Sequence, residues 1–352
     1  MSGILSPAFL QSAGRPGKVQ PTPPTPFSGI KLISVSDDLM LGLNGTDITV
    51  VSTKNGQPHT ETYASVNDSI LIYADENTET IITGNITGSL DLLENIDLKS
   101  LTIINTEVSG ISGLNCYTLQ ELNVSENSAL NTLNCSGCQI LQELNLSANT
   151  ALTELYCNNC YILKELDLST STALTNIECN GCYSLQELNL STNTALTSID
   201  CGNCYSLQEL NVSKNSALNI LYCSHCCVLQ ELNLSTNTAL TYINCGDCYY
   251  LQELNLSANT ALTDIDCSSC YSLQELNLST NTALTSLTCG WFEKTNTIYY
   301  PGTNSDVSTA IANAITDANI DNGTVYTDSA GAYYSTIADA ATAKGWTIEQ
   351  LS

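Results

Sequence analysis

Residues 185–206 read Leu-Gln-Glu-Leu-Asn-Leu-Ser-Thr-Asn-Thr-Ala-Leu-Thr-Ser-Ile-Asp-Cys-Gly-Asn-Cys-Tyr-Ser, and nearly the same text recurs at every twenty-second position from Leu119 to Cys289. The unit divides into two equal halves, Leu-x-x-Leu-x-Leu-x-x-Asn-x-Ala and Leu-x-x-Ile-x-Cys-x-x-Cys-x-x. A fixed period of this length is the signature of a stacked repeat architecture. The repeat therefore decides the fold of about half the chain.

Each half of the unit predicts one short strand, because successive side chains of a strand point to opposite faces. In the first half Leu188 and Leu190 should point inward and Asn189 outward. In the second half Ile199 and Cys201 should point inward. Two strands per coil imply two parallel sheets that enclose one narrow core.

A single coil of this length cannot stand alone. Its inward aliphatic side chains contribute roughly 1.5–3 kcal/mol each, whereas ordering the backbone costs roughly 1–2 kcal/mol per residue. Neighbouring coils supply the hydrogen bonds and cover the open faces, so stability is a sum of neighbour terms. At about 4.8 Å per coil, eight coils form a prism on the order of 40 Å long.

The 17 cysteines follow the repeat. One row occupies the second inward strand position: Cys135, Cys157, Cys179, Cys201, Cys223, Cys245, Cys267 and Cys289. A second row occupies the slot where the repeat consensus takes Asn or Cys: Cys116, Cys138, Cys160, Cys182, Cys204, Cys226, Cys248 and Cys270. Cys227 is left over, in a slot usually held by Tyr.

The alternative interpretation of these cysteines is zinc. Successive C-x-x-C pairs, such as Cys179 with Cys182 and Cys201 with Cys204, match a zinc-ribbon spacing. The period of the repeat generates that spacing automatically, and free Cys behaves as a small, well-buried hydrophobe. We therefore expect a core ladder and no metal site.

Residues 1–27 are expected to form an extended anchor arm. They contain six of the eight prolines, which favours a polyproline-like segment without a core. Arg15 and Lys18 lie in this arm, which has no acidic residue. We expect it to attach the protein to partners in a larger assembly; a disordered tail is the alternative.

Residues 28–88 alternate apolar and polar side chains and predict a small β unit, with tight turns at Asn44-Gly45 and Asn55-Gly56. Residues 89–118 should be an N-terminal cap of irregular coils that leads into the solenoid at 119–290.

Residues 291–352 predict an α/β C-terminal cap. A turn is expected at Tyr299-Tyr300-Pro301-Gly302, and a helix over 305–319 that starts at Ser305-Asp306. The pattern then predicts a strand at 323–326, a helix at 333–343 and a strand at 346–348.

The repeats of 119–289 resemble bacterial leucine-rich repeats of the internalin-like type, in which coils stack a cysteine ladder. They are similar to repeats of Bacteroidetes and the viruses that infect them. The resemblance implies a mainly β fold: a leucine-rich-repeat solenoid of about eight 22-residue two-stranded coils, with an N-terminal β unit and a C-terminal α/β cap. It also implies macromolecular binding. Ser171 departs from the ladder of asparagines, so one rung should lack its side-chain amide bond.

A formal charge of −26 opposes binding to nucleic acid and to anionic lipid. No apolar run approaches the length of a membrane span, and the N-terminus lacks the pattern of a signal peptide. We expect neither nucleic-acid partners nor membrane insertion, while a homo-oligomer is possible.

Comparing the coils with one another separates two faces. On the first strand the outward residues hardly change from coil to coil. The first outward position of this strand is Glu in every coil: Glu121, Glu143, Glu165, Glu187, Glu209, Glu231, Glu253 and Glu275. On the second strand they vary, and the candidate binding residues are Tyr156, Glu178, Asp200, Tyr222, Tyr242, Asn244, Asp264 and Asp266. Diversity rich in Tyr, Asp and Asn is typical of recognition surfaces. We expect a protein or glycan ligand there, with neutral drift of solvated positions as the alternative.

Catalysis finds little support in the sequence. His225 beside Cys226 could form a nucleophile and base pair, but the repeat directs Cys226 inward and His225 outward. No phosphate-binding glycine loop is present. We expect no catalytic residue and no cofactor.

The sequence therefore predicts a structural and attachment protein without enzymatic activity. A phage virion fibre or decoration component, assembled in the host cytoplasm, is the favoured interpretation. A bacterial cell-surface leucine-rich-repeat adhesin is the alternative.

Overall fold

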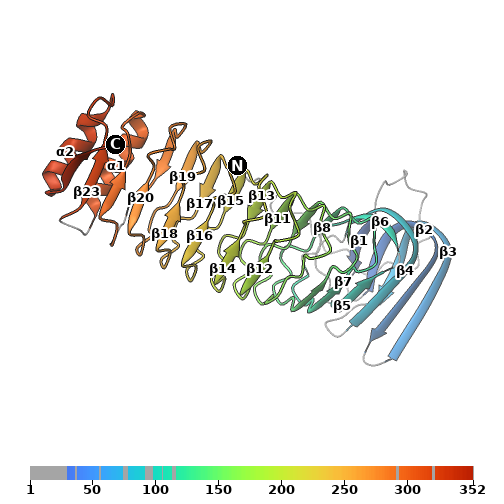
Figure 1. The fold of residues 1–352 in the computed structure, drawn as a ribbon. Helices are drawn as coiled ribbons and strands as arrows, with labels where there is room; N and C mark the ends of the chain where they lie inside the picture. Colours follow the sequence, from blue (N-terminus) through green and yellow to red (C-terminus); the bar gives the residue numbers. More distant parts are fainter. Residues whose placement is uncertain are drawn as a thin grey trace.

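The computed structural model of the chain describes residues 30–35, 38–54, 57–73, 78–91, 98–104, 106–112, 116–290, 293–318 and 322–351. It is a rod of stacked coils, with a long antiparallel hairpin at one end and two helices at the other (Figure 1). The expected mainly β fold is confirmed. Parallel stacking runs past the eight cysteine-bearing coils at both ends, to about twelve turns.

The first strand of each coil carries the glutamate row, and we call these the glutamate strands. They are β7 (Glu121–Asn123), β9 (Glu143–Asn145), β12 (Glu187–Asn189), β14 (Glu209–Asn211), β16 (Glu231–Asn233), β18 (Glu253–Asn255) and β20 (Glu275–Asn277). They pair with parallel register as β7–β9, β12–β14 and β16–β18, and β20 pairs with the C-terminal β22. Residues 165–167 of the third coil form no strand.

The second strands form a continuous parallel sheet, which we call the cysteine sheet. Its strands are β8 (Thr132–Asn134), β10 (Glu154–Tyr156), β11 (Asn176–Glu178), β13 (Ser198–Asp200), β15 (Ile220–Tyr222), β17 (Tyr242–Asn244), β19 (Asp264–Asp266) and β21 (Ser286–Thr288). The predicted orientations are confirmed. Leu188 is 3 % exposed, and Leu190, Ile199 and Cys201 are fully buried between the two rows of strands.

An asparagine ladder holds the turn that follows each glutamate strand. Asn193 is buried, and its Nδ2 donates to the carbonyls of Leu168 (3.0 Å) and Ser171 (2.8 Å) of the preceding coil. The same arrangement recurs at Asn149, Asn215, Asn237, Asn259 and Asn281. The Ser171 hydroxyl is buried without a hydrogen-bond partner. The expected missing rung is therefore confirmed in the third coil.

The cysteines line the core as free thiols. The Cys204 thiol donates to the Cys179 carbonyl of the preceding coil, with sulfur and oxygen 3.3 Å apart, and the same bond repeats along the array. Hydrogen bonding to the Cys204 thiol and then burial raise the pKa of Cys179 well above its usual value. A neutral thiol with a carbonyl partner is a stable core group, in agreement with the ladder interpretation.

The N-terminal part is a mainly antiparallel sheet joined to the solenoid. It contains β1 (Ile30–Val35), β2 (Asp38–Lys54), β3 (Gln57–Tyr73) and β4 (Thr78–Asp91), and only β1 and β4 pair in parallel. Three strands of this sheet, β2, β3 and β4, are longer than the short strands expected. Asn44-Gly45 lies inside β2, opposite Asn67 and Val66 of β3, so the predicted turn there is wrong. The pairing of β2 with both β3 and β4 overrides the local turn preference.

The chain passes from β4 into the coils through β5 (Leu98–Ile103) and β6 (Glu107–Ser112). β4 pairs in parallel with both, and these continue into β7 and β8 respectively. The hairpin and the two rows of the solenoid are thus connected by backbone hydrogen bonds.

The C-terminal part continues the glutamate strands. It contains β22 (Thr297–Tyr299), α1 (Ser305–Asp317), β23 (Thr324–Thr327), α2 (Tyr334–Lys344) and β24 (Thr347–Gln350), and its strands pair in parallel in the order β20-β22-β23-β24. The helix and strand positions expected after Ser305 agree within two residues. The start signal is one residue earlier than expected, because Asn304 Oδ1 accepts from the backbone of Asp306 and Val307. The sequence pattern does not predict β22, because Tyr299 falls within the expected turn.

Helix α1 covers the last strand of the cysteine sheet. It contacts β21, and the Cys289 thiol lies 3.7 Å from the Ala310 carbonyl. Within the part of the chain that the structure describes, no helix is long and apolar enough to cross a membrane.

Candidate binding surfaces

The structure brings the predicted variable residues together on the cysteine sheet. Tyr156, Glu178, Asp200, Tyr222, Asn244 and Asp266 face one another in register along six consecutive strands. Tyr242 and Asp264 are neighbours in the adjacent row. We call these eight residues the variable face.

Tyrosines give the variable face its apolar area. The rings of Tyr222 and Tyr242 meet with centroids 4.8 Å apart, and Tyr222 is 37 % exposed. The Tyr156 hydroxyl donates to Glu154 Oε2 at 3.2 Å. Partial burial raises the pKa of Tyr156 and of Tyr242, so both phenols are neutral near pH 7. Neutral rings of this kind are suitable anchors for a macromolecular ligand.

Three members of the variable face also hold the turns. The Oδ1 atoms of Asp200, Asn244 and Asp266 each accept a backbone N–H two residues later at 3.0 Å. This is an Asx turn, in which the side chain substitutes for a backbone acceptor. The Asp or Asn character of these positions is therefore structural as well as exposed. The signal in the sequence is an Asp or Asn two residues before a Gly or Ser, which repeats the Asn-x-Ser of the first half.

The corner after each second cysteine carries stacked tyrosines. Tyr161, Tyr183 and Tyr205 stack with centroids 4.6 and 4.9 Å apart, and Tyr249 stacks on Tyr271 at 5.2 Å. The rings pack against one another along the corner, but Tyr205 remains 43 % exposed. This edge is consequently an apolar surface and not an internal packing layer.

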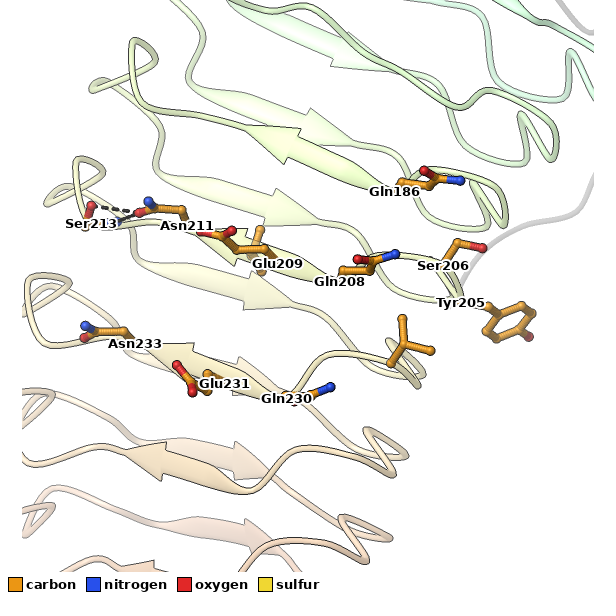
Figure 2. Close-up of a pocket in the computed structure, with 12 residues that line it drawn as sticks. Gln186, Tyr205, Ser206, Gln208, Glu209, Asn211, Ser213, Gln230, Glu231 and Asn233 are labelled. Carbon is orange, nitrogen blue, oxygen red and sulfur yellow. Dashed lines mark hydrogen bonds between the residues drawn. The ribbon is translucent and has the colours of Figure 1, made fainter.

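Grooves lie between the glutamate strands where pairing is interrupted. One groove of about 940 Å³ separates β14 from β16 (Figure 2). Its lining includes Glu209, Glu231 and the side-chain amides of Gln and Asn residues from the same coils and the coil before them. Smaller grooves separate residues 164–169 from β12 and β18 from β20. The variable face lines none of these three grooves. The sequence pattern predicts which strands carry the variable residues, but it contains no signal for the grooves between the glutamate strands.

The candidate dyad of His225 and Cys226 is not assembled. Cys226 is buried and its thiol donates to the Cys201 carbonyl, whereas His225 points outward toward Asp247, with Nε2 and Oδ2 3.5 Å apart. Cys227 is half-buried, and burial raises the pKa of its thiol. Among the described residues, no group of three or more His, Cys, Asp or Glu side chains could hold a metal ion. Arg15 and Lys18 of the expected anchor arm lie outside the described residues.

No family model matches the chain, and no curated protein matches it. Among solved structures, the chain is similar to the functional domain of InlJ from Listeria monocytogenes, which includes a cysteine ladder, with 26 % identity and a TM-score of 0.32 over 66 % of this chain. It spans only 55 % of that structure. It is also similar to an internalin, InlF, from Listeria monocytogenes, with 14 % identity and a TM-score of 0.36 over 77 % of this chain and 87 % of the other.

The resemblance to cysteine-ladder, internalin-like repeats that was expected from the sequence is confirmed, because paired cysteines stack from coil to coil in this solenoid.

Proposed function

We propose that the protein is a binding protein without enzymatic activity that presents the variable face of its solenoid to a macromolecular ligand. The observation that carries this proposal is the contrast between faces. Diversity is concentrated on one continuous, in-register sheet, while the glutamate row is the same in every coil. Rigid tyrosines on a preformed surface lose little entropy when they bind.

The shape of the variable face favours a large ligand. None of the three grooves lies on it, and small-molecule sites are concave. An extended sheet instead suits a protein or glycan surface that contacts several coils at once.

The test of the face is a triple substitution, Tyr156→Ala, Tyr222→Ala and Tyr242→Ala. The probe is a panel of whole bacterial cells and purified phage particles, to which the fluorescently labelled full-length protein is added. Labelling should fall at least tenfold with the triple variant. The matched control, Tyr161→Ala with Tyr183→Ala on the corner, should retain it. Equal labelling by the triple variant and the unaltered protein would contradict the assignment of the face.

We further propose that the protein is a fibre or decoration component of a phage virion, attached through residues 1–27. The free thiols of the core support assembly in a reducing compartment. The alternative is a bacterial cell-surface adhesin. Mass spectrometry of purified virions against cell-envelope fractions separates the two: the protein should be enriched in the virions, and enrichment in envelopes alone would exclude the virion role.

A further inference from the structure

We propose that the interrupted tyrosine stack at Cys227, together with the groove between β14 and β16, is a second binding site, which takes an aromatic side chain of a basic protein segment. The site lies on the glutamate side and on its corner, away from the variable face. It is therefore independent of the function proposed above.

The tyrosine stack lacks one ring. Tyr161, Tyr183 and Tyr205 form one stack and Tyr249 and Tyr271 another, with Cys227 in the slot between them. Two coils separate Tyr205 from Tyr249, so their rings are about 10 Å apart at the spacing of strands. Aromatic pairs prefer centroids about 4.5–7 Å apart. One ring placed midway would thus stack on both tyrosines.

Cys227 does not occupy the slot that a tyrosine would fill. Its thiol is turned back toward the turns, with sulfur 3.3 Å from the His225 carbonyl and 3.8 Å from the Asp247 carbonyl. On the open side Tyr205 is 43 % exposed, and Val228, the next residue after Cys227, is 36 % exposed. The site therefore offers the exposed ring of Tyr205 and an apolar floor at Val228.

The groove continues from this slot along the interrupted glutamate strands. Figure 2 shows Tyr205 at one end, the row Gln208, Glu209 and Asn211 on one wall, and Gln230, Glu231 and Asn233 on the other. Among the described residues that line it, none is Lys, Arg or His; Lys214 follows Ser213 at the end farthest from Tyr205.

Charge selects the occupant. Two carboxylates face each other across the groove in a protein of net charge −26. A ligand with ammonium or guanidinium groups beside its aromatic ring would neutralise them, and cations also interact favourably with tyrosine faces. A neutral glycan could stack on Tyr205 but would leave the repulsion between Glu209 and Glu231 in place. A basic, aromatic-bearing protein segment fits both features.

The test uses the full chain and a capped synthetic peptide, Trp-Gly-Lys-Lys, titrated by NMR chemical-shift changes. Two comparison peptides replace Trp by Leu or both Lys by Glu, and chitotriose represents a glycan. We expect the Trp-Gly-Lys-Lys peptide to bind at least tenfold more tightly than either comparison peptide, with affinity falling as salt rises. Equal affinity for the three peptides, or saturable binding of chitotriose without binding of the peptide, overturns the proposal.

Variants locate the site. Cys227→Tyr completes the stack and should remove binding while it raises thermal stability, because the new ring packs between two existing ones. Tyr205→Ala removes one wall at an exposed position and should weaken binding at least tenfold. Gln139→Tyr fills the other non-tyrosine slot of the row, between Tyr117 and Tyr161, and should leave binding unchanged. Wild-type affinity in both the Cys227→Tyr and Tyr205→Ala variants overturns the proposal, whatever the variable face does.

Discussion

The two rows of strands in this solenoid are built from half-repeats with almost the same pattern, yet one forms an unbroken sheet and the other separates into short groups of two to four strands. On the cysteine side, the residue before each strand donates its backbone N–H to the preceding coil at 2.8–2.9 Å, as from Thr285 N to the Thr263 carbonyl at 2.9 Å. At the equivalent position on the glutamate side the bond varies, with 2.9 Å between Gln252 N and the Gln230 carbonyl and 3.4 Å between Gln274 N and the Gln252 carbonyl. No strand pairing joins β14 to β16 or β18 to β20 in the described part of the chain.

Two differences in the half-repeats explain this contrast. The second inward position is Cys on one side and the larger Leu or Val on the other, so the cysteine side needs less space between coils. The outward positions are mixed on the cysteine sheet, whereas the glutamate row stacks like charges at each step, which is destabilising. Continuity of a sheet thus depends on what stands on both of its faces and not only on the strand pattern.

The largest change in the free energy of unfolding is expected when a side chain that bonds to the preceding coil is removed. The asparagines form these bonds after the glutamate strands, and the cysteines form them after the strands of the cysteine sheet. Asn193→Ala removes two hydrogen bonds to buried carbonyls and should lower the free energy of unfolding by roughly 2 kcal/mol. Cys204→Ala removes one weak thiol bond and should cost about 1 kcal/mol. Urea unfolding of both variants measures the difference. A larger loss for Cys204→Ala would show that the thiol ladder holds the coils more strongly than the amide ladder.

In the third coil, a substitution that completes the asparagine ladder should stabilise the protein. Its residues 165–167 form no strand, and Leu144 of the preceding coil is only partly buried. Ser171→Asn should restore the rung by donating to the carbonyls of the second coil, and raise the free energy of unfolding by about 1 kcal/mol. Hydrogen exchange at 164–168 should slow at the same time.

The control for this change is Ser171→Ala. Because the Ser171 hydroxyl has no partner, its removal should be neutral. If Ser171→Asn and Ser171→Ala have the same stability, the ladder does not limit strand formation in the third coil.

The periodic part of the fold was predictable because each coil repeats the same local information. The inward residues, the missing rung at Ser171 and the strand positions other than residues 165–167 follow from the fixed period of the repeat and the alternation of a strand. The period predicted a strand at 165–167 as well, and that prediction is wrong. The C-terminal helices were also predictable, since caps and apolar faces are local signals. β22 was missed because its pairing with β20 and β23 is set by distant strands.

The candidate sites were predictable only in part, because the grooves arise from small differences in spacing that accumulate between coils. No single residue marks the separation of β14 from β16. By contrast, the slot at Cys227 was visible in the sequence as one cysteine among tyrosines. Only the structure, with stacked tyrosines on both sides of the slot, indicates that the slot can accept a ring.

A smaller effect is expected from neutralising the glutamate row. Glu209→Gln with Glu231→Gln removes the repulsion across the groove and should raise the free energy of unfolding by about 0.5 kcal/mol at low salt, within the range of cross-strand pairs. The gain should shrink in high salt, because exposed charges are screened. The matched variant Glu178→Gln with Asp264→Asn on the cysteine sheet should show less salt dependence. Equal salt dependence of the two would argue against charge as the cause of the interrupted pairing.

An effect of similarly small size is expected at the turns that follow the strands of the cysteine sheet. The third residue of each Cys-x-x-Cys segment has a positive φ, as at Asn159 (60°), Asn203 (56°) and His225 (57°). Asn tolerates this left-handed region better than His, since its short side chain bonds locally. His225→Asn should therefore raise the free energy of unfolding by about 0.5 kcal/mol, even though it removes the contact with Asp247, which is exposed and worth about 0–1 kcal/mol. Asp247→Asn is the control, because it exchanges two residues that both tolerate a φ of 58°, and it should change stability little. Thermal unfolding at pH 7.5 measures both, and a loss of stability in His225→Asn would show that the contact with Asp247 outweighs the strain of the turn.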